Sequence, residues 1–202
     1  NPKNNSSNSP RLGIGYAVFG LAVLLAKAGM LVLKIKELER NIQDLEIWNH
    51  ELRPEEKTYL NIAKQIALQI KGKTPIVVGA EFLTGNLRVL RNQFCENSKN
   101  FVGYLTLPEL NHYAMEGLAN PEANRNNLIF FFVDSKFYHP RVQKRSELTK
   151  EVVRRNKLKF LEYKLKGETK LEQALSLLQL GTWISFYLGV LNNENPVTNF
   201  WV

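Results

Sequence analysis

Apolar residues in the middle of the chain fall into short runs that predict buried β-strands. The first run is Pro75–Ala80, a β-branched stretch between turn residues, and the most apolar one is Leu128–Val133. Continuous apolar runs without polar alternation are typical of strands that are covered on both faces. Two further segments, Phe101–Leu105 and Leu158–Leu165, complete the set of four predicted strands.

Helical spacing of apolar residues appears between and around these strands. The predicted helices are Leu12–Leu33, Ile35–Trp48, Glu55–Ile70, Leu83–Phe94, Glu147–Arg155 and Leu171–Leu191. Because strands alternate with helices, we expect a three-layer α/β domain with a parallel sheet and a helical N-terminal lead-in. Ligands of such sheets bind beyond the carboxyl ends of the strands, which here means the loops after Ala80, Leu105 and Asp134.

The first ten residues differ in composition from the rest of the chain. They include four Asn, three Ser and two Pro, a polar mixture that cannot bury a core. We therefore interpret residues 1–10 as a linker that follows another domain. Residues 11–72 are then a helical segment between domains, and residues 73–202 the sheet domain.

The 202 residues carry a formal net charge of +8, and 44% of them are hydrophobic. This length and composition suit a globular domain with an ordinary core. Lys and Arg are spread along the chain and are not interleaved with stacking aromatic residues, so we expect no nucleic-acid partner. The positive charge suits an anionic substrate such as a sugar phosphate equally well, and charge alone does not choose between the two.

The chain has one cysteine, Cys95. One cysteine cannot form an internal disulfide, and metal sites usually gather several soft ligands. We therefore expect no metal and a reducing compartment, the cytoplasm.

The segment Leu12–Leu33 is nearly all apolar and is long enough to cross a membrane or to serve as a signal sequence. However, Lys27 lies inside the segment, four glycines interrupt it, and no comparable segment follows. We therefore expect a buried helix of a soluble core and no membrane partner, with a membrane anchor as the alternative.

Candidate chemistry lies on both sides of the predicted strand Phe101–Leu105. Glu96 precedes the strand and His112 follows it, so a carboxylate and an imidazole flank one strand and are candidates for one pocket. A single Glu or His is more often structural than catalytic, so this pattern alone is weak.

Several motifs around these two residues resemble those of one family. Arg91–Lys99 (Arg-Asn-Gln-Phe-Cys-Glu-Asn-Ser-Lys) and Leu107–His112 (Leu-Pro-Glu-Leu-Asn-His) resemble the signature of bifunctional phosphoglucose/phosphomannose isomerases. Further similar motifs follow the family's order: Pro10-Arg11 with Gly15-Tyr16, Asn61–Ala67, Leu180-Gly181 with Ser185–Leu188, and Asn195-Pro196. The resemblance implies a C-terminal domain of the sugar isomerase (SIS) fold.

The resemblance also implies roles for particular side chains. Glu96 matches the general base that moves a proton between C1 and C2 of the sugar through a cis-enediol. His112 matches the group that assists opening of the pyranose ring, and Arg11 the cation that stabilises the enediolate. The remaining predicted substrate-binding residues are Gln93, Asn97 and Asn111.

The chain departs from the family's pattern at three positions. Tyr113 replaces the usual Asn after the loop histidine, Thr182 replaces an Asp after Leu-Gly, and Asn195 replaces the Asp before Pro. We also expect two parts of the family's active site to lie outside this chain. These are an N-terminal SIS domain that binds the substrate phosphate and a catalytic Lys on a final helix.

The resemblance implies an isomerase that converts glucose 6-phosphate or mannose 6-phosphate to fructose 6-phosphate without metal or cofactor. It implies a homodimer with active sites at the subunit interface, to which this chain contributes a C-terminal part. Two alternatives stay open, a SIS module that binds sugar phosphates without turning them over and the membrane-anchored protein.

Overall fold

The structure, a computed structural model, describes residues 9–199. Its contacts divide the chain into two compact units, Glu51–Pro196 and a smaller unit made of Asn1–His50 with Val197–Val202. This division differs from the predicted boundary at residue 73. The larger unit includes α3 (Ile62–Ile70) because this helix packs against α8 (Lys170–Leu191). Most of the predicted linker, residues 1–8, lies outside the described residues.

The smaller unit contains the 3-10 turn η1 (Pro10–Gly13), helix α1 (Ile14–Lys27) and most of α2 (Ile35–Leu52). Helix α1 ends before Leu33 because Gly29 adopts a left-handed φ of 73° and the Met30 N–H bonds back to the Leu25 carbonyl. Its 14 residues rise about 21 Å, less than the roughly 30 Å of a bilayer core.

The prediction that this helix is buried was wrong, because no residue of α1 is buried. Leu21 is 58% exposed and Leu24 is 66% exposed. The described part of the smaller unit offers α1 only one other long helix, α2, which can cover one side of it.

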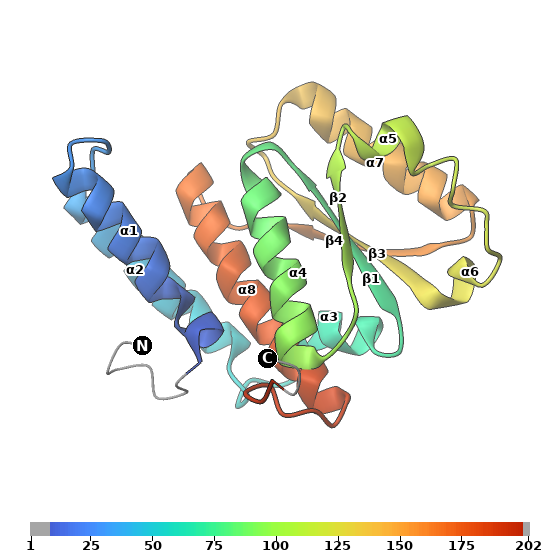
Figure 1. Ribbon diagram of the computed structural model, residues 1–202, viewed down its shortest axis with the longest axis horizontal. Helices are drawn as coiled ribbons and strands as arrows, with labels where there is room; N and C mark the ends of the chain where they lie inside the picture. The colour runs from blue at the N-terminus through green and yellow to red at the C-terminus, as the bar shows by residue number, and fades with distance from the viewer. Residues whose placement is uncertain (1–8, 200–202) are drawn as a thin grey trace. The chain divides into compact units, whose positions relative to one another are not determined.

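The larger unit contains a four-stranded parallel sheet, as predicted (Figure 1). The strands are β1 (Thr74–Ala80), β2 (Gly103–Leu107), β3 (Leu128–Asp134) and β4 (Lys159–Lys164), in the order β2-β1-β3-β4. All four predicted strands are present, and β2 begins two residues later than predicted. The reason is that the preceding helix continues to Ser98 before the chain turns through a left-handed residue.

Helices cover both faces of this sheet, which confirms the three-layer α/β prediction. Helix α4 (Thr84–Ser98) connects β1 to β2, and α7 (Pro140–Arg155) connects β3 to β4. The two connections run in opposite directions across the sheet, so right-handed crossovers place α4 and α7 on opposite faces. In Figure 1, α3, α4 and α8 lie on one side, and α7 with the short helices α5 (Leu110–Tyr113) and α6 (Asn124–Asn127) on the other.

Helix α3 begins at Ile62 and not at Glu55 as predicted. The side chain of Asn61, which is fully buried, accepts a hydrogen bond from the Lys64 backbone N–H and so caps the first turn. Its amide group also donates to the Arg53 carbonyl at 3.1 Å, which holds the non-helical approach to the helix.

Helix α8 packs closely against α4 and forms the centre of one helical layer. Within the described chain it is the one helix long and apolar enough to cross a membrane, so the expectation that no apolar segment comparable to Leu12–Leu33 follows was wrong. However, 56% of its most apolar stretch is buried inside the domain, which is usual for a core helix. Gly181 and Gly189 allow α8 to lie close to α4, since a side chain at either position would collide with α4.

We predict that Gly181→Ala destabilises the domain by about 1–3 kcal/mol, the usual cost of overpacking. The added methyl group would overlap Gln93 Oε1 and would lie 2.5 Å from Leu90 Cδ1. Gly85→Ala on α4 is the matched control, because a side chain there meets open space. Urea unfolding measures both variants, and equal stability of Gly181→Ala and wild type would contradict the packing described.

Candidate functional site

The crevice where ligands usually bind such a sheet is filled by Tyr138. The carboxyl ends of β1 and β3 are neighbours, and their connections leave toward opposite faces, as at a typical binding crevice. Tyr138 is 3% exposed there. Its hydroxyl accepts the Ala80 N–H at 3.0 Å and donates to the Val133 carbonyl at 3.1 Å. Burial raises the pKa of this phenol, which keeps it a neutral donor.

The loops after β1 and β3 are also joined directly to each other. The His139 backbone N–H donates to Glu81 Oε1 at 2.9 Å, and Glu81 has a left-handed φ of 49°. Side chains of the protein itself therefore occupy the space directly between these two loops, and ligand binding at the loops after Ala80 and Asp134 stays a prediction. The loop after β2 is the third expected position, and it borders a cavity described below.

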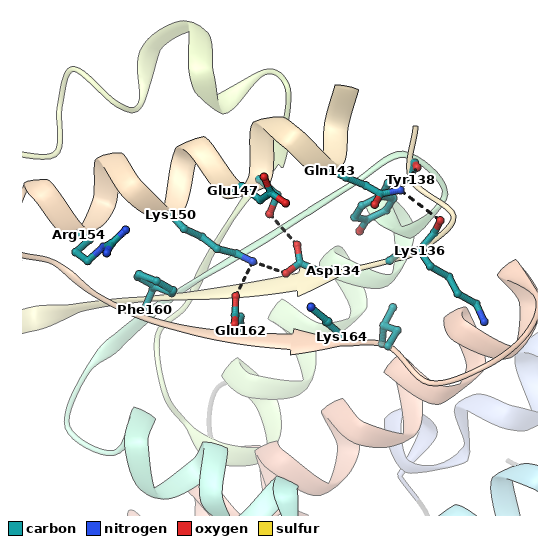
Figure 2. Close-up of a pocket in the computed structure, with 13 residues that line it drawn as sticks. Asp134, Lys136, Tyr138, Gln143, Glu147, Lys150, Arg154, Phe160, Glu162 and Lys164 are labelled. Atoms are coloured by element: carbon teal, nitrogen blue, oxygen red, sulfur yellow. Dashed lines mark hydrogen bonds and ion pairs between the residues drawn. The ribbon is translucent and has the colours of Figure 1, made fainter. Parts of the chain in front are cut away.

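A cavity of about 600 Å³ lies beside the carboxyl ends of β3 and β4, under α7 (Figure 2). Lys150 reaches into it from α7 and forms ion pairs with Asp134 and, at 2.8 Å, with Glu162. The Ser146 hydroxyl donates to the second oxygen of Asp134 at 2.7 Å. Each charged group at the centre of this cavity thus already has a protein partner, as expected of a structural network.

The charges of this network stabilise one another. Burial disfavours the ammonium form of Lys150, but the hydrogen bonds to Asp134 and Glu162 outweigh it, so the pKa of Lys150 is raised. The hydrogen bond from Lys150 and its positive charge lower the pKa of Glu162.

A second cavity, of about 390 Å³, lies beyond the carboxyl end of β2. It is lined by Pro108, Glu109, Asn111, His112 and Arg145. Two of the predicted site residues, Asn111 and His112, therefore lie at one cavity, on or beside the short helix α5. Their side chains differ in exposure, because His112 is exposed and Asn111 is half-buried.

Glu96 lies elsewhere in the domain. It is half-buried on the last turn of α4, before β2 begins, whereas His112 follows the end of β2. The five residues of β2 span about 16 Å, and the two groups lie beyond its opposite ends. Among the described residues, Glu96 is not part of the lining of the His112 cavity.

The predicted substrate-binding amides Gln93 and Asn97 are buried between α4 and α8. Gln93 Nε2 donates to Thr182 Oγ1 at 2.8 Å, and Asn97 Nδ2 donates to Ser185 Oγ at 2.9 Å. Both amides therefore hold the helix that carries Glu96, and direct contact of either with a substrate stays a prediction. The family's usual Asp at position 182 is here a Thr that accepts the bond from Gln93.

Arg11 belongs to the smaller unit, where its guanidinium donates to the Val197 carbonyl at 2.7 Å. Its role beside Glu96, which belongs to the larger unit, stays a prediction.

Sequence analysis did not single out Tyr138, Lys150 or Arg145. The only local signal for Tyr138 was an aromatic residue in the loop after a predicted strand at the centre of the sheet. Lys150 and Arg145 lie on a helix rich in charged residues, and their cavities follow from the order of the strands, which the sequence did not provide.

Residues 60–199 match the family model described as "Bacterial phospho-glucose isomerase C-terminal SIS domain". The chain belongs to this family. The SIS domain contains Glu96 and His112 within the matched region. Its fold is thus the SIS-type α/β fold that the sequence predicted.

Two curated relatives are bifunctional phosphoglucose/phosphomannose isomerases. The protein from Caldicellulosiruptor bescii is 26% identical over 195 residues, which is 95% of this chain and 57% of the relative. The protein from Aquifex aeolicus is 27% identical over 179 residues, which is 89% of this chain and 54% of the relative. The chain therefore spans somewhat more than half the length of the curated relatives it matches.

Solved structures show the same fold at lower identity. A glucose-6-phosphate isomerase like protein from Thermus thermophilus aligns with a TM-score of 0.62 and 20% identity, over 86% of this chain and 55% of that one. A hypothetical protein from the same organism aligns with a TM-score of 0.65 and 12% identity, over 78% of this chain and 46% of that one.

We predict that Tyr138→Phe lowers the free energy of unfolding by about 1–3 kcal/mol, because it leaves the buried Ala80 N–H without a partner. Tyr59→Phe removes the same atom from a side chain that is 69% exposed and is the control. Guanidinium unfolding gives both values. A loss of stability no larger than that of the control would show that the filled crevice does not depend on the hydroxyl.

We predict that Lys150→Met lowers stability at pH 7 by about 1–3 kcal/mol, since it removes the partner of two carboxylates. Because the pKa of Glu162 is lowered in the folded protein, its ion pair with Lys150 stabilises the fold above the usual carboxylate pKa near 4. This stabilisation is lost as the pH falls further. The difference between wild type and variant should therefore shrink below about pH 4. Urea unfolding across this pH range tests the sign, and a difference that grows on acidification would contradict it.

Proposed function

We propose that this SIS domain is part of a sugar-phosphate aldose–ketose isomerase that converts glucose 6-phosphate or mannose 6-phosphate to fructose 6-phosphate. The match of residues 60–199 to the family model carries the proposal, and the names of the two curated relatives support it. We further propose that the enzyme is cytoplasmic and uses neither metal nor cofactor.

The proposed reaction has two chemical stages. In the first, His112 moves a proton from the C1 hydroxyl to the ring oxygen as the C1–O5 bond breaks, which gives the open-chain aldehyde. In the second, Glu96 removes the proton from C2, and the negative charge of the resulting enediolate is stabilised by Arg11. The hydroxyl proton on O2 then passes to O1, Glu96 returns its proton to C1, and the product is the ketose. Glucose and mannose phosphates differ only at C2, so both pass through the same enediol.

We propose that the active site is completed by a second copy of the chain. Catalytic side chains work within about 3 Å of the atom they serve, and Glu96 and His112 lie beyond opposite ends of β2, a strand about 16 Å long. In a two-fold dimer, Glu96 of one protomer would face His112 of its partner. The exposed apolar side chains of α1 suit such an assembly, since exposed apolar surface is typical of interaction sites.

We predict that Glu96→Gln lowers kcat by at least 100-fold while the protein still binds glucose 6-phosphate, because the amide cannot accept the C2 proton. The assay is isomerase turnover by the complete protein that contains this chain. Glu116→Gln, which changes an exposed acid on the segment after α5, is the control with unchanged turnover. Binding by the wild type without any turnover would favour a sugar-phosphate sensor over the enzyme.

Mixed dimers test whether the site is shared. If Glu96 and His112 serve one site from different protomers, a mixture of inactive Glu96→Gln and His112→Ala chains regains about a quarter of wild-type activity, because each mixed dimer has one intact site. If the two residues serve a site within one chain, no mixed dimer has an intact site and the mixture stays inactive.

A further inference from the structure

Arg145 is the permanently charged cation among the residues that line the His112 cavity. It projects from α7, while His112 and Glu109 lie at the loop after β2, so two separate elements meet at this cavity. The imidazole can donate or accept a hydrogen bond, the guanidinium donates, and the carboxylate accepts. Such a set of groups suits a polyhydroxyl ligand, whose oxygens both donate and accept.

The guanidinium of Arg145 is not used by the protein itself. In the part of the chain that the structure describes, it forms neither a hydrogen bond nor an ion pair, and it is exposed. Most other cations of the same helix are paired with carboxylates. These cations are Lys144, Lys150, Arg154 and Arg155. Within the described residues, no ion pair joins Arg145 to Glu109 across the cavity either, so the donors of Arg145 are available to a ligand.

A chain of two hydrogen bonds joins the backbone of α7 at Arg145 to the short helix α5 that carries His112. Asn111 Nδ2, next to His112, donates to Thr149 Oγ1 at 2.8 Å. The Thr149 hydroxyl in turn donates to the Arg145 carbonyl oxygen at 2.7 Å. Thr149, in the middle of this connection, is 1% exposed, and Leu110, beside Asn111, is 2% exposed, so the connection is anchored in the core. The two helices that carry Arg145 and His112 therefore need little rearrangement when a ligand binds.

We propose that Arg145 binds the closed pyranose ring beside His112 and assists its opening, a role that rests on the function proposed above. During ring opening the C1–O5 bond breaks, the ring oxygen gains a proton and the C1 hydroxyl loses one. Arg145 does not give up its proton, so its part is to donate hydrogen bonds to the C1 oxygen as negative charge develops there. Because it lines the same cavity as His112, Arg145 acts on the same sugar ring as His112, together with Glu96 of the other protomer.

Two unreactive sugar phosphates test whether Arg145 binds the closed ring in particular or sugar phosphates in general. The closed-ring compound is methyl glucopyranoside 6-phosphate, which keeps the C1 oxygen but cannot open, and the open-chain compound is glucitol 6-phosphate. In the complete protein, we expect Arg145→Ala to weaken binding of the closed ring about 10-fold or more, as for the loss of a charge-assisted hydrogen bond. Binding of the open chain should change less than about twofold. Titration calorimetry measures both, and Arg141→Ala, which removes an exposed cation of α7 away from the cavity, should change neither.

Equal weakening of both compounds, or no weakening of the closed ring, would overturn the assignment of Arg145. Turnover provides an independent check, since Arg145→Lys keeps the charge and should retain more kcat than Arg145→Ala. Mixed dimers of Arg145→Ala and Glu96→Gln should also regain activity, as expected if the two residues serve one site from different protomers.

The outcomes distinguish this inference from the proposed function. If Glu96→Gln abolishes turnover but Arg145→Ala binds the closed ring normally, only the role of Arg145 fails. If the wild-type protein binds neither compound and has no isomerase activity, both proposals fail.

Discussion

The direction of strand β2 constrains what this chain can do as a catalyst. The strand pairs in parallel with β1 from Gly103 to Leu107, so its two ends lie at the amino and carboxyl ends of the sheet's strands. Glu96 precedes the amino end of β2, and His112 follows its carboxyl end. Backbone hydrogen bonds fix this strand, which is about 16 Å long, between the two groups. In the proposed enzyme, each chain therefore supplies two half-sites, and two chains are needed for one complete site.

Polar side chains near these half-sites hold the scaffold in place. Gln93 and Asn97 bind α8 and so fix the helix of Glu96, while Asn111 binds Thr149 and so fixes the helix of His112. The space between the carboxyl ends of β1 and β3 is filled by Tyr138. The proposed catalytic groups beyond the two ends of β2 suit a domain whose chemistry takes place at its surface against another protomer.

The sequence predicted the fold well wherever local pattern determines structure. The apolar runs Pro75–Ala80 and Leu128–Val133 identified the two central strands, because a strand that is covered on both faces consists almost entirely of apolar residues. Boundaries were less accurate where the deciding residue has no typical signature. Lys99 ends α4 in a left-handed conformation usually taken by Gly, and the prediction ended this helix at Phe94.

The site was only partly predictable for a different reason. A resemblance in sequence identified Glu96 and His112, and their order along the chain suggested that they flank one strand. Because a strand is extended, residues on its two sides lie at its opposite ends, so the pattern alone could not place them in one pocket. Arg145 and Tyr138 reach their cavities from elements distant in sequence, so only the arrangement in space reveals their partners.

A crystal structure of the complete protein with an open-chain enediolate analogue bound tests the shared site most directly. The account predicts that the Glu96 carboxylate contacts C1 and C2 of the analogue and that the nearest imidazole is His112 of the partner subunit. An analogue bound between Glu96 and a histidine of the same chain, or bound far from Glu96, would contradict it.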